Sequence, residues 1–142
     1  MKKNLIIIII TISLCVHRIF VKPYDYNIDR ACDYLTENAL SKSHCCCAWF
    51  VMRAMQEGGC PIGIAPAWYY KYLLPKYNFK EVDSSNNYAP KKGDIIVIEK
   101  SENHIWGHIA MYNGKQWISD FKQKNMNPYK NKYPYVIFRY NY

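Results

Sequence analysis

The feature that most constrains this chain is a cysteine at the predicted start of an amphipathic helix, with a histidine at the start of a predicted strand further along. The cysteine is Cys47, which Ala-Trp-Phe follows, and the histidine is His108, which lies between Gly107 and Ile109. A helix start lowers the pKa of a thiol, and an imidazole can take up its proton and return it. These two groups are what a thiol hydrolase needs, so we expect the two elements to pack together.

Sequence patterns predict helices first and strands afterwards. Helices are predicted over 27–40, over a segment that starts near Cys45 to Cys47 and ends at Gly58-Gly59, and over 67–74. The predicted strands are 77–82, 95–98, 107–112, 116–121 and 135–140. Helices followed by an antiparallel sheet indicate an α+β fold, with the Cys47 helix on the strand of His108.

The first residues have the pattern of a secretory signal peptide. Met1–Asn4 carries two lysines, and Leu5–Val16 is an almost unbroken apolar run that is too short to span a bilayer comfortably. We expect a signal peptide over 1–15, or to about residue 22, with a retained anchor as the alternative. Residues 24–142 then form a single cysteine-hydrolase domain. Its expected location is outside the cell, or in the periplasm if the source is bacterial.

The cysteine count agrees with export. The chain has six cysteines, of which Cys15 would leave with the leader and Cys47 must stay free as a nucleophile. The remaining four are an even number, compatible with two disulfides whose pairing stays open. They are Cys32, Cys45, Cys46 and Cys60. The alternative is that they are free thiols that act as small hydrophobic residues.

The charge balance is basic, with 19 lysines and arginines against 11 acidic residues and a formal net charge of +8. A cationic protein is attracted to anionic polymers and surfaces, but the sign alone does not choose among them. Lysines 122, 124, 130 and 132 alternate with tyrosines and other residues, and we interpret them as a solvated face rather than a dedicated binding patch. The 14 tyrosines and 4 tryptophans fit a groove for a sugar-bearing ligand and core packing equally well.

A thiol–imidazole pair works better with a third group that fixes the ring tautomer. Asp120 lies on the next predicted strand, across the Asn113-Gly114 turn, where cross-strand neighbours come within ~5 Å. It is therefore predicted to orient His108, and Asp94 is interpreted as a turn residue. The N–H of Cys47 and the loop before it are expected to hold the oxyanion.

A zinc site is the rival interpretation, because His104 and His108 have the i, i+4 spacing of ligands on a helix. The residues between them make a poor helix, and no glutamate adjoins either histidine as in HExxH sites. We therefore expect no metal at these histidines.

Several blocks of sequence resemble bacterial cell-wall amidases. Residues 43–59, Ser-x-x-x-Cys-Ala-x-x-Val-x-Arg-Ala-x-x-x-Gly-Gly, resemble the helix that carries their nucleophile. The second set consists of 90–94, 107–112, 117–123 and 135–140. In combination they resemble peptidoglycan amidases and endopeptidases of the papain-like NlpC/CHAP superfamily. The resemblance is strongest to type VI secretion amidase effectors, their secreted animal-domesticated relatives and phage-type murein hydrolases.

This resemblance implies a papain-like (NlpC/CHAP-type) α+β fold, with N-terminal helices packed on an antiparallel sheet. It implies Cys47 as nucleophile, His108 as general base and Asp120 as orienting acid, with no cofactor. The implied activity is that of a thiol protease, a bacteriolytic murein endopeptidase or amidase that cleaves stem peptides or cross-links. The family tends to have glycine where Cys45 stands, and secretion-system effectors usually lack a leader.

The expected partner is bacterial peptidoglycan, with no nucleic acid and no stable membrane insertion after leader removal. A monomer is expected, with an immunity protein as partner if the chain is a bacterial effector. The alternative function is a cationic, disulfide-bonded antibacterial protein that binds cell walls or membranes without catalysis. The bond that is cut stays open among a γ-D-glutamyl bond, a D-alanyl cross-link and the muramoyl–L-alanine amide.

Overall fold

A computed structural model of the chain describes residues 24–142, so the predicted leader lies outside the described residues. Three helices come first: α1 (Ile28–Asn38), α2 (Cys47–Glu57) and α3 (Tyr70–Leu73), the last between the 3-10 turns η1 (Ala67–Tyr69) and η2 (Leu74–Tyr77). Five strands follow: β1 (Phe79–Val82), β2 (Ile95–Ile98), β3 (His108–Tyr112), β4 (Trp117–Ile118) and β5 (Tyr135–Tyr140). No helix within 24–142 combines the length and apolarity needed to cross a bilayer.

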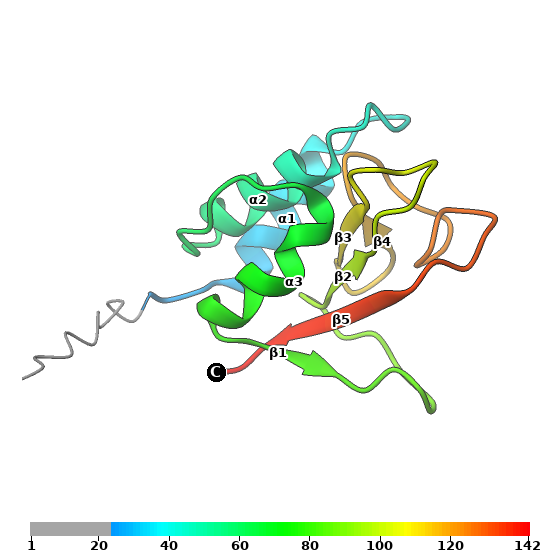
Figure 1. Ribbon diagram of the computed structural model, residues 1–142. Coiled ribbons are helices and arrows are strands. Elements are labelled where there is room, and N and C mark those ends of the chain that lie inside the picture. Colours follow the sequence, from blue (N-terminus) through cyan, green and yellow to red (C-terminus); the bar gives the residue numbers. More distant parts are fainter. Residues whose placement is uncertain (1–23) are drawn as a thin grey trace, which may run out of the picture.

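The strands form one antiparallel sheet in the order β1-β5-β2-β3-β4, and α1 and α2 lie together on one side of it (Figure 1). This arrangement confirms the predicted α+β class. In the register between β2 and β3, Ile98 pairs with His108 and Ile95 pairs with Met111. Helix α2 packs directly on β3, so the start of the helix that carries Cys47 is brought to the strand of His108.

Each face of the sheet buries its own apolar cluster. Between helices and sheet, Val51 and Met55 of α2 pack with strand residues such as Ile109. On the other face, Trp117 and its neighbours are covered by aromatic residues of the segment before β5, including Tyr129. Fully burying a large apolar side chain is worth about 1.5–3 kcal/mol, so both clusters contribute to stability. Many tyrosines therefore serve core packing.

The fourth strand is much shorter than the predicted 116–121, because the chain leaves the sheet at Ser119. The N–H of Ser119 donates to the carbonyl of Phe121 at 3.0 Å, and the N–H of Gln123 donates back to the carbonyl of Trp117 at 2.9 Å. Ser119 and Asp120 are completely buried polar residues, and the Ser119 hydroxyl donates to the Asp120 carboxylate at 3.1 Å. Local side-chain bonds of this kind compete with a strand ladder and favour a turn.

The five cysteines between residues 24 and 142 are free, so the two expected disulfides are not found. Cys32 is buried in the core, where its sulfur lies 3.7 Å from the sulfur of Met111. Cys46 precedes α2 and Cys60 follows it, and a helix of 11 residues separates its ends by about 16 Å. A disulfide needs Cα atoms within about 7 Å, so these two cannot pair. Cys32 and Cys60 are the small buried hydrophobic residues of the alternative interpretation.

Candidate active site

Cys47 is the first residue of α2 and only 9% exposed. Burial raises the pKa of its thiol to about 11, and the negative charge of Asp120 acts in the same direction. The backbone N–H groups of Ile109 and Ala48, which hydrogen-bond the sulfur, oppose this rise. The expectation that the helix start lowers the pKa of this thiol is therefore outweighed by desolvation.

His108 opens β3 with its ring buried, and its Nε2 lies 2.6 Å from Oε1 of Gln123. The amide nitrogen of Gln123 donates to the carbonyls of Asn125 at 3.1 Å and Met126 at 3.3 Å. The amide oxygen must therefore face the ring, which makes Nε2 the protonated nitrogen and leaves Nδ1 as the acceptor. Burial lowers the pKa of His108 below its ordinary value, so the ring is neutral at neutral pH.

Cys47 and His108 line the same cavity, of about 300 Å³. Its wall on the solvent side is the turn 103–107. Tyr129 closes another side, with its ring centroid 5.7 Å from that of His108 and 3.9 Å from that of His104. His104 is thus an aromatic wall residue of the cavity that Cys47 and His108 both line.

Asp120 lies beside this cavity but serves the loop before α2. Its Oδ2 accepts hydrogen bonds from the N–H of His44 at 2.6 Å, the N–H of Cys46 at 3.2 Å and the hydroxyl of Ser43 at 3.3 Å. We expected Asp120 to accept a hydrogen bond from the ring of His108, but Gln123 accepts it instead. Asp120 still acts on the ring through its charge, which favours the protonated imidazole and partly offsets burial in the pKa of His108.

The early end of β4 explains why Gln123 takes this place. The hairpin pairs Met111 with Ile118, so a continued strand would bring Asp120 opposite Ile109. The chain instead doubles back after Ile118, and Gln123 returns toward the start of β3 with 2% exposure. The only sign in the sequence that Gln123 could have a special role was its position as a neutral amide between two lysines, at the end of the 117–123 block.

The loop before α2 has few free N–H groups for an oxyanion. Those of His44 and Cys46 bind Asp120, and that of Cys45 donates to the hydroxyl of Ser43 at 3.3 Å. The N–H of Cys47, at the N-terminal end of α2, is therefore the best-placed donor. Cys45 has a φ of +59°, a left-handed conformation that glycine adopts more easily. This accounts for the glycine that the resemblance in sequence leads us to expect at this position.

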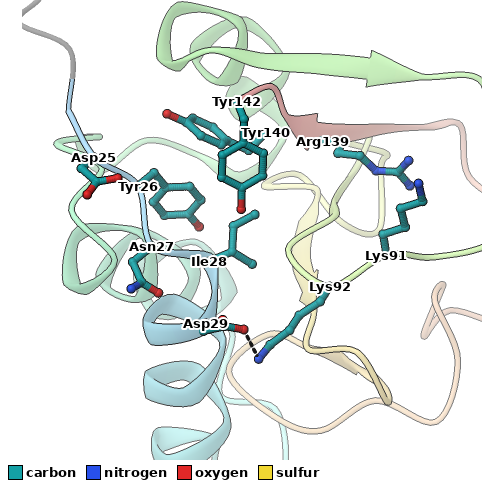
Figure 2. A pocket seen from close by; sticks show the side chains of 10 residues that line it. All are labelled: Asp25, Tyr26, Asn27, Ile28, Asp29, Lys91, Lys92, Arg139, Tyr140 and Tyr142. Atoms are coloured by element: carbon teal, nitrogen blue, oxygen red, sulfur yellow. Dashed lines mark hydrogen bonds and ion pairs between the residues drawn. The ribbon is translucent and has the colours of Figure 1, made fainter.

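A second cavity, of about 600 Å³, lies where α1 begins and contains none of the predicted site residues (Figure 2). The N–H of Asn27 donates to the carbonyl of Gly58 at 2.8 Å, which places the start of α1 at the end of α2. This cavity and Cys47 are therefore at opposite ends of α2.

The CHAP domain family matches residues 38–118, a stretch that contains both Cys47 and His108. The chain belongs to the CHAP domain family. A solved type VI effector–immunity complex, Tae3–Tai3 from Ralstonia pickettii, contains a chain 34% identical to this one, with a TM-score of 0.74. The match covers 82% of this chain and 100% of the other. The selenomethionine form of the same complex matches at 33% identity and a TM-score of 0.69, over 77% of this chain and 98% of the other.

No curated protein sequence matches the chain. The family and the structural match confirm the papain-like fold and the resemblance to peptidoglycan amidases of the CHAP superfamily. The CHAP protein is accordingly an enzyme of the peptidoglycan amidase and peptidase class.

Proposed function

We propose that this CHAP protein hydrolyses a peptide or amide bond of peptidoglycan stem peptides or cross-links through an acyl-enzyme on Cys47. The observation that carries the proposal is the shared cavity of Cys47 and His108, with the ring held by Gln123 so that Nδ1 is free to accept a proton. Both groups are neutral in the resting enzyme, because burial raises the pKa of the thiol and lowers that of the imidazole.

In the first half of the reaction, the sulfur of Cys47 attacks the carbonyl carbon while Nδ1 of His108 takes the thiol proton. The N–H of Cys47 donates to the developing oxyanion. The carbon–nitrogen bond then breaks, and the imidazolium returns the proton to the departing amine. The charge of Asp120 favours the protonated ring and so stabilises this intermediate state.

In the second half, water replaces the amine and His108 removes a proton from it. The hydroxide attacks the thioester, the carbon–sulfur bond breaks, and His108 returns the proton to the sulfur. The products are a carboxylic acid and the free thiol of Cys47. Gln123 keeps Nε2 protonated throughout by accepting its hydrogen bond.

Export and partners belong to the same proposal. The signal-peptide pattern of residues 1–15 supports a single secreted domain over 24–142 that acts on cell walls outside the producing cell or in a periplasm. The related Tae3 was solved with the immunity protein Tai3, which supports an immunity protein as partner if the chain is a bacterial effector.

The test compares the native chain with Cys47→Ala on purified sacculi, following soluble muropeptides by mass spectrometry. We expect release by the native chain and a loss of at least a thousandfold in the variant, because only binding and oxyanion stabilisation remain. Equal release by both proteins would contradict the acyl-enzyme. Bacterial killing that persists in Cys47→Ala and fades with salt would favour the non-catalytic alternative.

A further inference from the structure

A cationic cavity of about 410 Å³ adjoins the cavity of the nucleophile, and Ser43 lines both. We call it the lysine pocket, after Lys42, Lys122 and Lys124, which line it together with Ser41, Ser43 and Asn125. Every polar side chain among its lining residues can donate a hydrogen bond, and none is acidic. A pocket of this composition is suited to an anion.

The lysines of this pocket have no acidic partner within residues 24–142, in contrast to Lys92 and Arg139. In the cavity of Figure 2, Lys92 is paired with Asp29 at 2.5 Å, and Arg139 of the same cavity binds the buried carboxylate of Asp94. No described residue forms an ion pair with Lys42, Lys122 or Lys124. Three unneutralised cations around one hollow give a local positive potential that a bound anion would relieve.

The two walls of the lysine pocket are fixed to each other before any ligand binds. Leu40 and Phe121 form a bridge, and the N–H of Leu40 donates to the carbonyl of Asp120 at 2.8 Å. The Asp120 carboxylate also accepts from the hydroxyl of Ser43, so residues 41–43 are held against the segment that follows β4. A preorganised pocket loses less entropy when it binds a ligand.

The pocket also shares a segment with the catalytic ring. Lys122 and Lys124 flank Gln123, whose buried side chain binds His108, while both lysines are exposed and line the pocket. Three consecutive residues therefore provide two cations for binding and the amide that orients the base. A group bound by the lysines would therefore lie next to the segment that orients His108.

We propose that the lysine pocket is a subsite for a free carboxylate of the stem peptide, next to the bond that is cut. This inference rests on the proposed function, because stem peptides carry free carboxylates on their D-glutamyl and diamino-acid residues. It replaces the interpretation of Lys122 and Lys124 as part of a solvated face. A peptide whose carboxylates are converted to amides loses the charge that the three lysines recognise.

The experiment measures binding by calorimetry, with the full chain carrying Cys47→Ala to prevent turnover. The probes are L-alanyl-γ-D-glutamyl-meso-diaminopimelyl-D-alanine and the same peptide with its glutamyl and diaminopimelyl carboxylates amidated. We expect the free acid to bind at least about tenfold more tightly. Adding Lys42→Gln, Lys122→Gln and Lys124→Gln should remove that preference and leave the affinity for the amidated peptide unchanged.

The matched control carries Lys76→Gln, Lys80→Gln and Lys115→Gln, three exposed lysines away from the pocket, and should keep the preference. Equal binding of both peptides by the parent protein, or a preference that the pocket variant retains, overturns the subsite. Cleavage of the same peptides by the native chain reports on the proposed function separately. A protein that prefers the free acid but cuts neither peptide would overturn the proposed reaction and leave the subsite supported.

Discussion

At the residue scale, the protonation of Cys47 and His108 would determine how the proposed reaction starts. Burial raises the pKa of the thiol to about 11 and lowers that of the imidazole, so a neutral pair is present at neutral pH. The imidazole must be unprotonated to accept the thiol proton. The acid limb of the pH–rate profile therefore reports His108, and the thiol titrates far above it.

We expect kcat/KM on sacculi to fall as pH drops through a value below 6.5, the ordinary pKa of histidine. Above that value it should be flat through neutral pH, because a neutral His108 is already present. The measurement is the rate of muropeptide release from pH 4 to 9 at constant ionic strength. An acid limb centred above 7 would contradict a ring whose pKa is dominated by burial.

In the proposed mechanism Gln123 is a positioning residue, since it would act on the reaction through its contact with His108. Gln123→Leu should lower kcat by roughly tenfold to a hundredfold with little change in KM, because the ring loses its tautomer and orientation. Gln123→Glu should shift the acid limb to higher pH, because a carboxylate beside Nε2 favours the imidazolium. A purely structural role for Gln123 would leave the acid limb where it is in both variants.

At the element scale, the fold around α2 depends on a buried aspartate from another part of the chain. No side chain caps the first turn of α2 at Cys46, and the Asp120 carboxylate accepts from the backbone there instead. A negative charge near a helix N-terminus is stabilising, although the same charge opposes ionisation of Cys47. Asp120 thus stabilises the loop before α2 and at the same time raises the pKa of the Cys47 thiol.

Asp94, just before β2, is a second buried aspartate that holds together segments from different parts of the chain. It is completely buried and binds Arg139 of β5 through two hydrogen bonds of 2.7 and 2.8 Å, and it also accepts from Tyr88. Asp94→Asn should lower the free energy of unfolding by roughly 2–4 kcal/mol, because it leaves the charge of Arg139 without its partner. The side chain of Arg139 is partly exposed, so water compensates for part of the lost interaction. Urea unfolding measures this, with the exposed Glu81→Gln as control. Equal stability of the two variants would contradict a structural role for the pair.

The sequence predicted most elements because their patterns are local. β2 and β5 have their predicted bounds, and α2 begins at the residue that the nucleophile hypothesis required. The failure at β4 came from a turn in which Ser119 and Asp120 are buried, and that burial involves contacts of Asp120 with residues far away in the sequence, such as His44. Gln123 was missed for the same reason, since its contact with His108 depends on that turn.

At the scale of the whole molecule, the apolar core takes the place of the predicted disulfides. Cys32 and Cys60 fill positions between the helices and the sheet, whereas Cys45 and Cys46 are exposed. The buried thiols of Cys32 and Cys60 can therefore be told apart from the exposed thiols of Cys45 and Cys46 by their rates of chemical labelling. Stability should not depend on reducing agent.

Thiol labelling of the native chain should modify Cys45 and Cys46 first, with Cys32, Cys47 and Cys60 protected by burial. After denaturation without reductant, all five should react. Peptide mass spectrometry identifies the labelled residues and separates them from Cys15. A count of one reactive thiol among the five would instead show that two disulfides had formed.

The antiparallel packing of α1 and α2 has a practical consequence. Tyr142 and Asp25 line one cavity (Figure 2). Asn27 of the same cavity is hydrogen-bonded to Gly58, so both termini of the described chain lie at the end of α2 away from Cys47. A carrier protein, bead or surface tethered at either terminus would be separated from the nucleophile by the length of that helix, about 16 Å. An enzyme immobilised in this way would have the cavity of Cys47 on the side away from the support, facing an insoluble polymer such as a sacculus.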